Sequence, residues 1–104
     1  MAKITDAVEW HVGGEIAGNT SVTACPTQEC RWVKFKAKHD NAGIVAVGPK
    51  STLTLPAGTD TATAGWPLAA GEETDWMPVA TGDLASIYNI AANAGDDLIY
   101  IYLR

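Results

Sequence analysis

Turn-forming residues interrupt the chain at short intervals, and this punctuation constrains the fold more than any other feature of the sequence. Each apolar run stops within a few residues, for example at Gly13-Gly14 and at Gly48-Pro49. Short apolar runs bounded by Gly, Pro, Asn and Asp are typical of β-strands, whereas a helix needs a longer uninterrupted pattern. The sequence therefore predicts an all-β chain.

Three segments define the expected strands most clearly. Residues 31–37 alternate between apolar and polar side chains, which indicates a strand with one buried face. The turn at residues 39–43 contains Asn and Gly, which tolerate positive φ, and it predicts a hairpin to a second strand at residues 44–47. The run at residues 98–103 is aromatic and β-branched and predicts a further strand. Other strands are expected at residues 7–12, 20–24, 73–79 and 87–91. Residues 51–65 are expected to form a weak strand followed by a long loop. One helical turn is expected at residues 81–86, where Asp83 can accept hydrogen bonds from the N–H groups that follow.

The number of strands predicts the architecture. About seven or eight short strands at regular spacing are typical of an antiparallel β-sandwich or barrel, of jelly-roll or immunoglobulin-like type. Antibody domains carry cysteines on two distant strands, whereas Cys25 and Cys30 lie close together in the sequence, so the jelly roll is favoured. A chain of 104 residues fits a single sandwich domain over residues 1–104, with residues 1–6 expected to form a flexible N-terminal arm.

The charge distribution and the lack of long apolar runs argue against two partners, nucleic acid and membrane. The formal net charge is −5, and the 7 Lys and Arg residues form no cluster of the kind that binds a phosphate backbone. Lys34, Lys36 and Lys38 alternate along one strand and are interpreted as a solvated outer face. No apolar run is long enough to span a bilayer, and the first residues lack a secretory signal. We therefore expect a soluble product of the cytoplasm that binds neither nucleic acid nor membrane.

The two cysteines leave two alternatives open. Cys25 and Cys30 could close a small disulfide loop, or they could remain thiols, which is the default in a reducing cytosol. A zinc site needs further ligands at compact spacing, and the only other soft ligands are His11 and His39. We therefore expect neither a metal nor another cofactor.

No combination of residues indicates catalysis. The sequence contains no nucleophile elbow, phosphate-binding glycine loop or paired-histidine zinc motif. The acidic pairs Glu72-Glu73 and Asp96-Asp97 are formed by neighbours, whose side chains point to opposite faces of a strand, so neither pair builds a glycosidase site. These carboxylates are interpreted as exposed turn residues. The chain is expected not to be an enzyme.

The 4 tryptophans are many for a chain of this length. Their aromatic faces could stack on sugar rings and form a carbohydrate-binding platform. Alternatively, they supply large apolar area to the core and to an interface, which is the interpretation we favour because one precedes a proline in a loop. They are Trp10, Trp32, Trp66 and Trp76.

The last strand is apolar on both of its faces. Leu98, Tyr100 and Tyr102 lie on one side, and the alternate residues are Ile99, Ile101 and Leu103. A strand covered on one face should alternate with polar residues, so both faces require cover. One interpretation places the second face against a neighbouring subunit or docking partner. The other makes this a central strand whose tyrosine hydroxyls reach solvent at the rim of the sheet.

From Trp32 to the C-terminus, the order of several short segments resembles that of small virion proteins of tailed bacteriophages. Each segment is weakly specific, and the resemblance lies in their order along about two-thirds of the chain. The N-terminal third, which includes Cys25 and Cys30, has no counterpart in the pattern. The matching segments are Val33-Lys34-Phe35-Lys36-Ala37, Asp40-Asn41-Ala42-Gly43, Val47-Gly48, Gly65-Trp66-Pro67-Leu68-Ala69-Ala70-Gly71-Glu72, Asp83-Leu84-Ala85-Ser86-Ile87-Tyr88 and Gly95-Asp96-Asp97-Leu98-Ile99-Tyr100.

Within this group the chain resembles the jelly-roll cement or decoration proteins. The resemblance implies a dimer or trimer on the outer capsid surface of the virion, which binds the major capsid protein and stabilises contacts between its subunits by apolar burial and edge-strand pairing. The alternative is a tail, neck or adhesin module that binds carbohydrate or another virion protein. The candidate subunit or capsid contacts are Trp32, Trp66, Leu98, Tyr100 and Tyr102.

Overall fold

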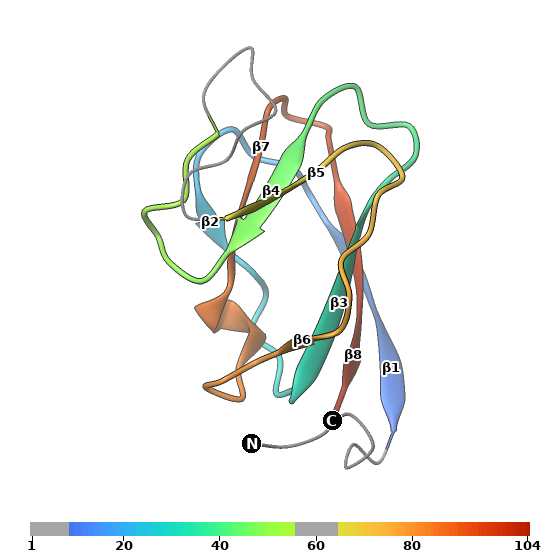
Figure 1. Ribbon diagram of the computed structural model, residues 1–104, viewed down its shortest axis with the longest axis vertical. Coiled ribbons are helices and arrows are strands. Elements are labelled where there is room, and N and C mark those ends of the chain that lie inside the picture. Colours follow the sequence, from blue (N-terminus) through green and yellow to red (C-terminus); the bar gives the residue numbers. More distant parts are fainter. Residues whose placement is uncertain (1–8, 56–64) are drawn as a thin grey trace.

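Two antiparallel sheets of four strands each face one another in the computed structural model, which describes residues 9–55 and 65–104 (Figure 1). The first sheet has the strand order β1-β8-β3-β6, and the second has the order β2-β7-β4-β5. This is the strand order of a jelly roll, so the expected all-β sandwich is confirmed. The strands are β1 (Trp10–Ile16), β2 (Thr23–Ala24), β3 (Trp32–Ala37), β4 (Val45–Gly48), β5 (Trp66–Leu68), β6 (Met77–Pro78), β7 (Tyr88–Ala91) and β8 (Leu98–Leu103).

Two expectations concern residues that are not described. The N-terminal arm at residues 1–6 and most of the loop expected at residues 51–65 lie outside the described residues. The expected helical turn is confirmed as a 3-10 turn, η2 (Leu84–Ser86). A carboxylate oxygen of Asp83 caps this turn by accepting a hydrogen bond from the Ala85 N–H at 3.0 Å.

The core lies between the sheets and follows the alternation of the strands. Val33, Phe35 and Ala37 of β3 are fully buried, as their pattern predicts. In β8 the buried residues are Leu98, Tyr100 and Tyr102. β8 pairs with β1 on one side and with β3 on the other, so it is a central strand of its sheet.

The hairpin expected between residues 31–37 and 44–47 is wrong. β3 and β4 belong to different sheets, and their connection crosses from one layer to the other. The buried carboxylate of Asp96 holds this connection by accepting hydrogen bonds from the N–H groups of Ala42 at 2.8 Å and Gly43 at 3.0 Å. A contact between residues so distant in sequence overrides the local preference of an Asn/Gly turn for a hairpin.

The first strand does not stop at Gly13-Gly14, as the sequence indicated, but continues to Ile16 through a β-bulge at the two glycines. Gly14 adopts a φ of 106°, which a residue with a side chain rarely tolerates. A Cβ at Gly13 would collide with the ring of Tyr100. The glycines therefore bend the strand over a large core side chain instead of ending it.

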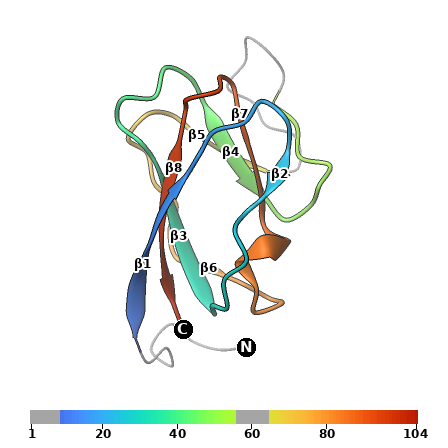
Figure 2. The same cartoon turned by 180° about the vertical axis from the view of Figure 1, so that it is seen from behind.

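The outer face of the second sheet is covered by another segment of the chain, whereas that of the first sheet is exposed. In the second sheet, Ala46 and Ile90 pack under Leu53, which comes from the segment after β4. In the first sheet, β1, β8 and β3 run side by side (Figure 2), and Val12 and Ile99 on their outer face are exposed. The first sheet thus has an apolar outer face that the described part of the chain leaves open.

Candidate interaction surfaces

The outer face of the first sheet is built from three rows of side chains that cross β1, β8 and β3. Because paired residues of neighbouring strands point to the same side of a sheet, the strand register defines each row. The first row carries two indoles, the second is mainly aliphatic and the third has opposite charges at its two ends. The rows are Trp10–Leu103–Trp32, Val12–Ile101–Lys34 and Glu15–Ile99–Lys36.

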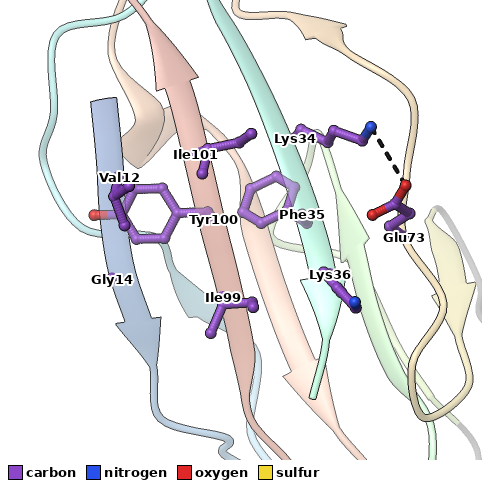
Figure 3. A pocket seen from close by; sticks show the side chains of 9 residues that line it. All are labelled: Val12, Gly14, Lys34, Phe35, Lys36, Glu73, Ile99, Tyr100 and Ile101. Carbon is purple, nitrogen blue, oxygen red and sulfur yellow. Dashed lines mark ion pairs between the residues drawn. The ribbon is translucent and has the colours of Figure 1, made fainter. Parts of the chain in front are cut away.

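The middle of this outer face is apolar and its rims are charged. Val12 is 74% exposed and Ile99 is 39% exposed. A hollow of about 240 Å³ lies between them and the lysines of β3, where the bulge residue Gly14 provides no side chain (Figure 3). Lys34 forms an ion pair with Glu73 across 3.4 Å at one rim, as the dashed line in Figure 3 shows.

Three candidate contacts prove to be core residues, which corrects the expectation. Leu98 is 1%, Tyr100 is 8% and Tyr102 is 9% exposed. The Tyr100 ring extends beneath β1 (Figure 3), where the glycine at position 13 leaves room for it, and the Tyr102 ring stacks on His11 with centroids 5.1 Å apart. The outward side chains of β8 are therefore Ile99, Ile101 and Leu103, which strand alternation had placed on one face without showing which face was buried.

A second apolar surface lies at the open side of the sandwich, between edge strands β5 and β6. Trp66 of β5 is 64% exposed there and borders a hollow of about 510 Å³. Both edge strands contain a proline, Pro67 and Pro78, which cannot donate a ladder hydrogen bond. Side chains rather than an added strand would therefore bind a partner here. We call this the Trp66 hollow; its other lining residues are Val47, Gly48, Pro49, Lys50, Gly65, Met77, Pro78 and Ile87.

The tryptophans do not form one platform. Trp10 is 63% exposed, but β1 lies at the edge of the first sheet opposite to β6, whereas Trp66 borders β6. Trp32 and Trp76 are half-buried. The indole nitrogen of Trp32 is buried and has no hydrogen-bond partner among the described residues. Two separate exposed indoles fit contacts on two sides of the molecule better than one stacking surface.

Both cysteines are free thiols and both are buried, so the alternative of a disulfide is not realised. Burial raises the pKa of the Cys25 thiol to about 11, although the Asn89 side chain, whose amide lies 3.5 Å from Sγ, opposes the shift. Burial also raises the pKa of Cys30 to about 11, with the nearby Asp83 carboxylate adding to it. A thiol that stays protonated is a poor nucleophile and a poor metal ligand, so these cysteines belong to the core.

Native protein is expected to resist thiol alkylation near about pH 8, where an ordinary thiol reacts readily, and to react fully in denaturing urea. Stability should also fall as the pH rises from 9.0, the ordinary thiol pKa, to about 11, because only the unfolded chain releases the protons in this window. The measurements are mass spectrometry after a timed alkylation and urea unfolding at several pH values. Rapid labelling of both thiols in the folded protein would contradict the burial.

The acidic pairs have structural partners. Asp96 binds the loop before β4, and Asp97 accepts a hydrogen bond from the Gly18 N–H at 2.8 Å, which lowers the Asp97 pKa. Glu72 accepts from the Ala69 N–H at 2.6 Å, and Glu73 pairs with Lys34. Within residues 9–55 and 65–104, no group of three or more His, Cys, Asp or Glu side chains is placed to hold a metal ion. These carboxylates connect loops and strands.

Comparisons with known proteins identify no relative of this chain. No protein-family model matches the chain, and no curated protein or solved structure is significantly similar to it. Among the described residues, no helix has the length and apolar character required to cross a bilayer. The interpretation therefore depends on the surfaces themselves.

Proposed function

We propose that this chain is a non-catalytic structural protein of a tailed-bacteriophage virion, a cement or decoration protein on the outer capsid surface. It would bind the major capsid protein as a dimer or trimer and stabilise contacts between neighbouring capsid subunits. The observation that carries the proposal is the Trp66 hollow, since a large exposed indole beside an apolar depression is typical of a protein-binding hot spot. The jelly-roll order and the resemblance of residues 32–104 support it.

The chemistry of the Trp66 hollow favours a protein partner over a sugar. Carbohydrate sites combine a stacking ring with several polar side chains that bind hydroxyl groups. Among the described residues that line this hollow, Lys50 has the single charged side chain, and the large side chains around it, such as Met77 and Ile87, are apolar. A tail, neck or adhesin module that binds glycans would need polar groups that the described lining of the hollow does not provide.

A modest contact energy per subunit can suffice when many copies of the protein bind the same capsid. An icosahedral shell presents the same seam repeatedly, so an oligomer with a weak contact per subunit binds with much greater avidity. Apolar burial in the Trp66 hollow would supply the contact energy. Edge-strand pairing, which the sequence led us to expect, is disfavoured at this side because of Pro67 and Pro78.

Trp66→Ala is expected to weaken binding to purified expanded capsids by about tenfold or more, because removal of a hot-spot tryptophan commonly costs this much. Trp66→Phe, which keeps an aromatic ring, should lose less. Asp40→Ala, in the exposed loop after β3, is the control and should bind normally. Binding is measured by co-sedimentation with capsids, and folding is checked by circular dichroism.

The same variants separate the two functions. If glycans quench the fluorescence of Trp66 and capsids do not retain the wild-type protein, the chain is an adhesin module and the cement proposal is wrong. Retention on capsids that depends on Trp66, without any glycan response, supports it. The copy number in purified virions gives an independent answer, because a capsid protein is present in far more copies than a tail or neck protein.

A further inference from the structure

The outer face of the first sheet is complementary to itself about one axis only. When two copies of a face meet with two-fold symmetry, the axis must lie in the plane of contact. If it runs along the central strand β8, β1 of one copy covers β3 of the other and each row meets its equivalent. Glu15, which forms an ion pair with Lys38 of its own chain across 3.4 Å, then also faces Lys36 of the second copy, and the symmetry repeats this contact on the other side.

Other orientations of the axis place charges unfavourably. An axis perpendicular to the strands would set Trp10 over Glu15 of the second copy and desolvate a carboxylate against an indole. An axis along either diagonal of the face would set Glu15 against Glu15, or Lys36 against Lys36. Like charges placed opposite one another across an interface are repulsive. The charges thus select the arrangement along β8.

We propose that a second copy of this chain covers the outer face of the first sheet, in a face-to-face dimer whose two-fold axis runs along β8. The outward side chains Ile99, Ile101 and Leu103 of the two copies meet on the axis. The indole rows meet at one end of the interface, and the Glu15–Lys36 pairs lie at the other end. The sheets pack in the aligned manner of a β-sandwich, with strand directions within about 30° of each other.

Burial and the hollow fit this arrangement. Val12, the most exposed large apolar residue of the described chain, faces Lys34 of the second copy, whose alkyl stem can cover it while its ammonium group reaches Glu73 at the rim. The depression above Gly14 is open space, so β3 of the second copy can approach there without a clash. The most exposed apolar residue and the most open position thus lie against the lysine-bearing strand of the second copy.

The size of the interface sets the expected affinity. Three strands spaced about 4.8 Å apart and about 20 Å long give a footprint of about 300 Å². Stable interfaces usually bury about 800 Å² per partner, so the dimer should be weak and should form only at high protein concentration. Such a contact suits a protein that gains its strength from assembly on a repeating surface.

This inference rests on the oligomeric role in the proposed function and names its surface. It uses the side of the molecule formed by β1, β8 and β3, whereas capsid binding is assigned to the Trp66 hollow beside β5 and β6. A dimer without Trp66-dependent capsid retention would contradict the proposed function alone. Capsid retention by a protein that remains monomeric in solution would contradict the dimer and leave the capsid-binding role of the Trp66 hollow intact.

Charge reversal provides the sharpest test, with sedimentation equilibrium over a range of concentrations as the measurement. Glu15→Lys alone and Lys36→Glu alone should each weaken the dimer about tenfold or more, because two attractive pairs become repulsive. The double variant Glu15→Lys/Lys36→Glu should return to within about threefold of the wild type. Glu29→Lys, in the loop between β2 and β3, is the matched control and should dimerise normally.

Cross-linking locates the axis independently. Ile99→Cys places a thiol on the axis, so a short bis-maleimide, which can span the roughly 10 Å between two face-packed sheets, should produce a covalent dimer. Thr23→Cys, on the exposed strand β2 of the second sheet, should remain monomeric under the same conditions. A wild-type protein that stays monomeric at millimolar concentration, a trimer, or a double variant that is not rescued would each overturn the proposal. Rescue together with the Ile99→Cys cross-link would establish it.

Discussion

Replacing Tyr100 with lysine is expected to lower the free energy of unfolding by about 4 kcal/mol or more, because it removes a large core ring and buries a charge. The Tyr100 ring packs between Phe35 and Tyr102, with centroid distances of 6.4 Å and 6.2 Å. Ile99→Lys, one residue earlier on the outward face, should change the same quantity by less than about 1 kcal/mol. The measurement is urea unfolding followed by circular dichroism at concentrations below dimer formation.

Tyr100→Phe is the matched control, since it keeps the ring and should stay within about 1 kcal/mol of the wild type. The comparison tests the register of β8 directly. A slip of one residue would exchange the two faces of the strand, because side chains alternate. If Ile99→Lys unfolded the protein and Tyr100→Lys did not, the assignment of both faces would be wrong, and the dimer surface with it.

The sequence pattern defined the two faces of β8 but not which one is buried. Both faces are apolar, so alternation alone could not distinguish Tyr100 from Ile99 as a core residue. The choice depends on a distant part of the chain, where Gly13 gives the Tyr100 ring room beneath β1. Gly13-Gly14 is visible in the sequence, but a pair of glycines between apolar residues is typical of a turn. Only the pairing of β1 with β8 identifies it as a bulge.

The sequence predicts individual strands better than it predicts the surfaces that several strands form together. β3, β7, β8 and the capped turn at Asp83 follow from local chemistry, because alternation and capping act over a few residues. The row containing Glu15, Ile99 and Lys36 combines three strands that are far apart in the sequence. Such a row becomes visible only when the register is known, so Glu15 and Val12 were not among the candidate residues. Trp66 was among the candidate contacts, and it is 64% exposed.

Asp96→Ala is expected to lower the free energy of unfolding by about 3 kcal/mol, since it removes a buried carboxylate and leaves three part-buried donors without their acceptor. The Asp96 carboxylate is 3% exposed and accepts hydrogen bonds from Ala42 N–H, from Gly43 N–H and from the Asn93 amide at 2.9 Å. These bonds tie the crossover between β3 and β4 to the loop before β8. Without them, the crossover loses the contact that replaces the local hairpin.

Asp97→Ala provides the matched comparison, because its half-buried carboxylate accepts a backbone hydrogen bond from Gly18 and otherwise interacts with the side chains of Glu15 and Lys38. The expected loss there is about 1 kcal/mol. Amide hydrogen exchange separates the two roles, since in Asp96→Ala the amides of Ala42 and Gly43 should exchange much faster, while those of central β8 follow global unfolding. Unchanged protection of both amides would mean that the Asp96 carboxylate does not hold the crossover. The connection between the sheets would then have to be maintained by the core packing of β3 and β4 alone.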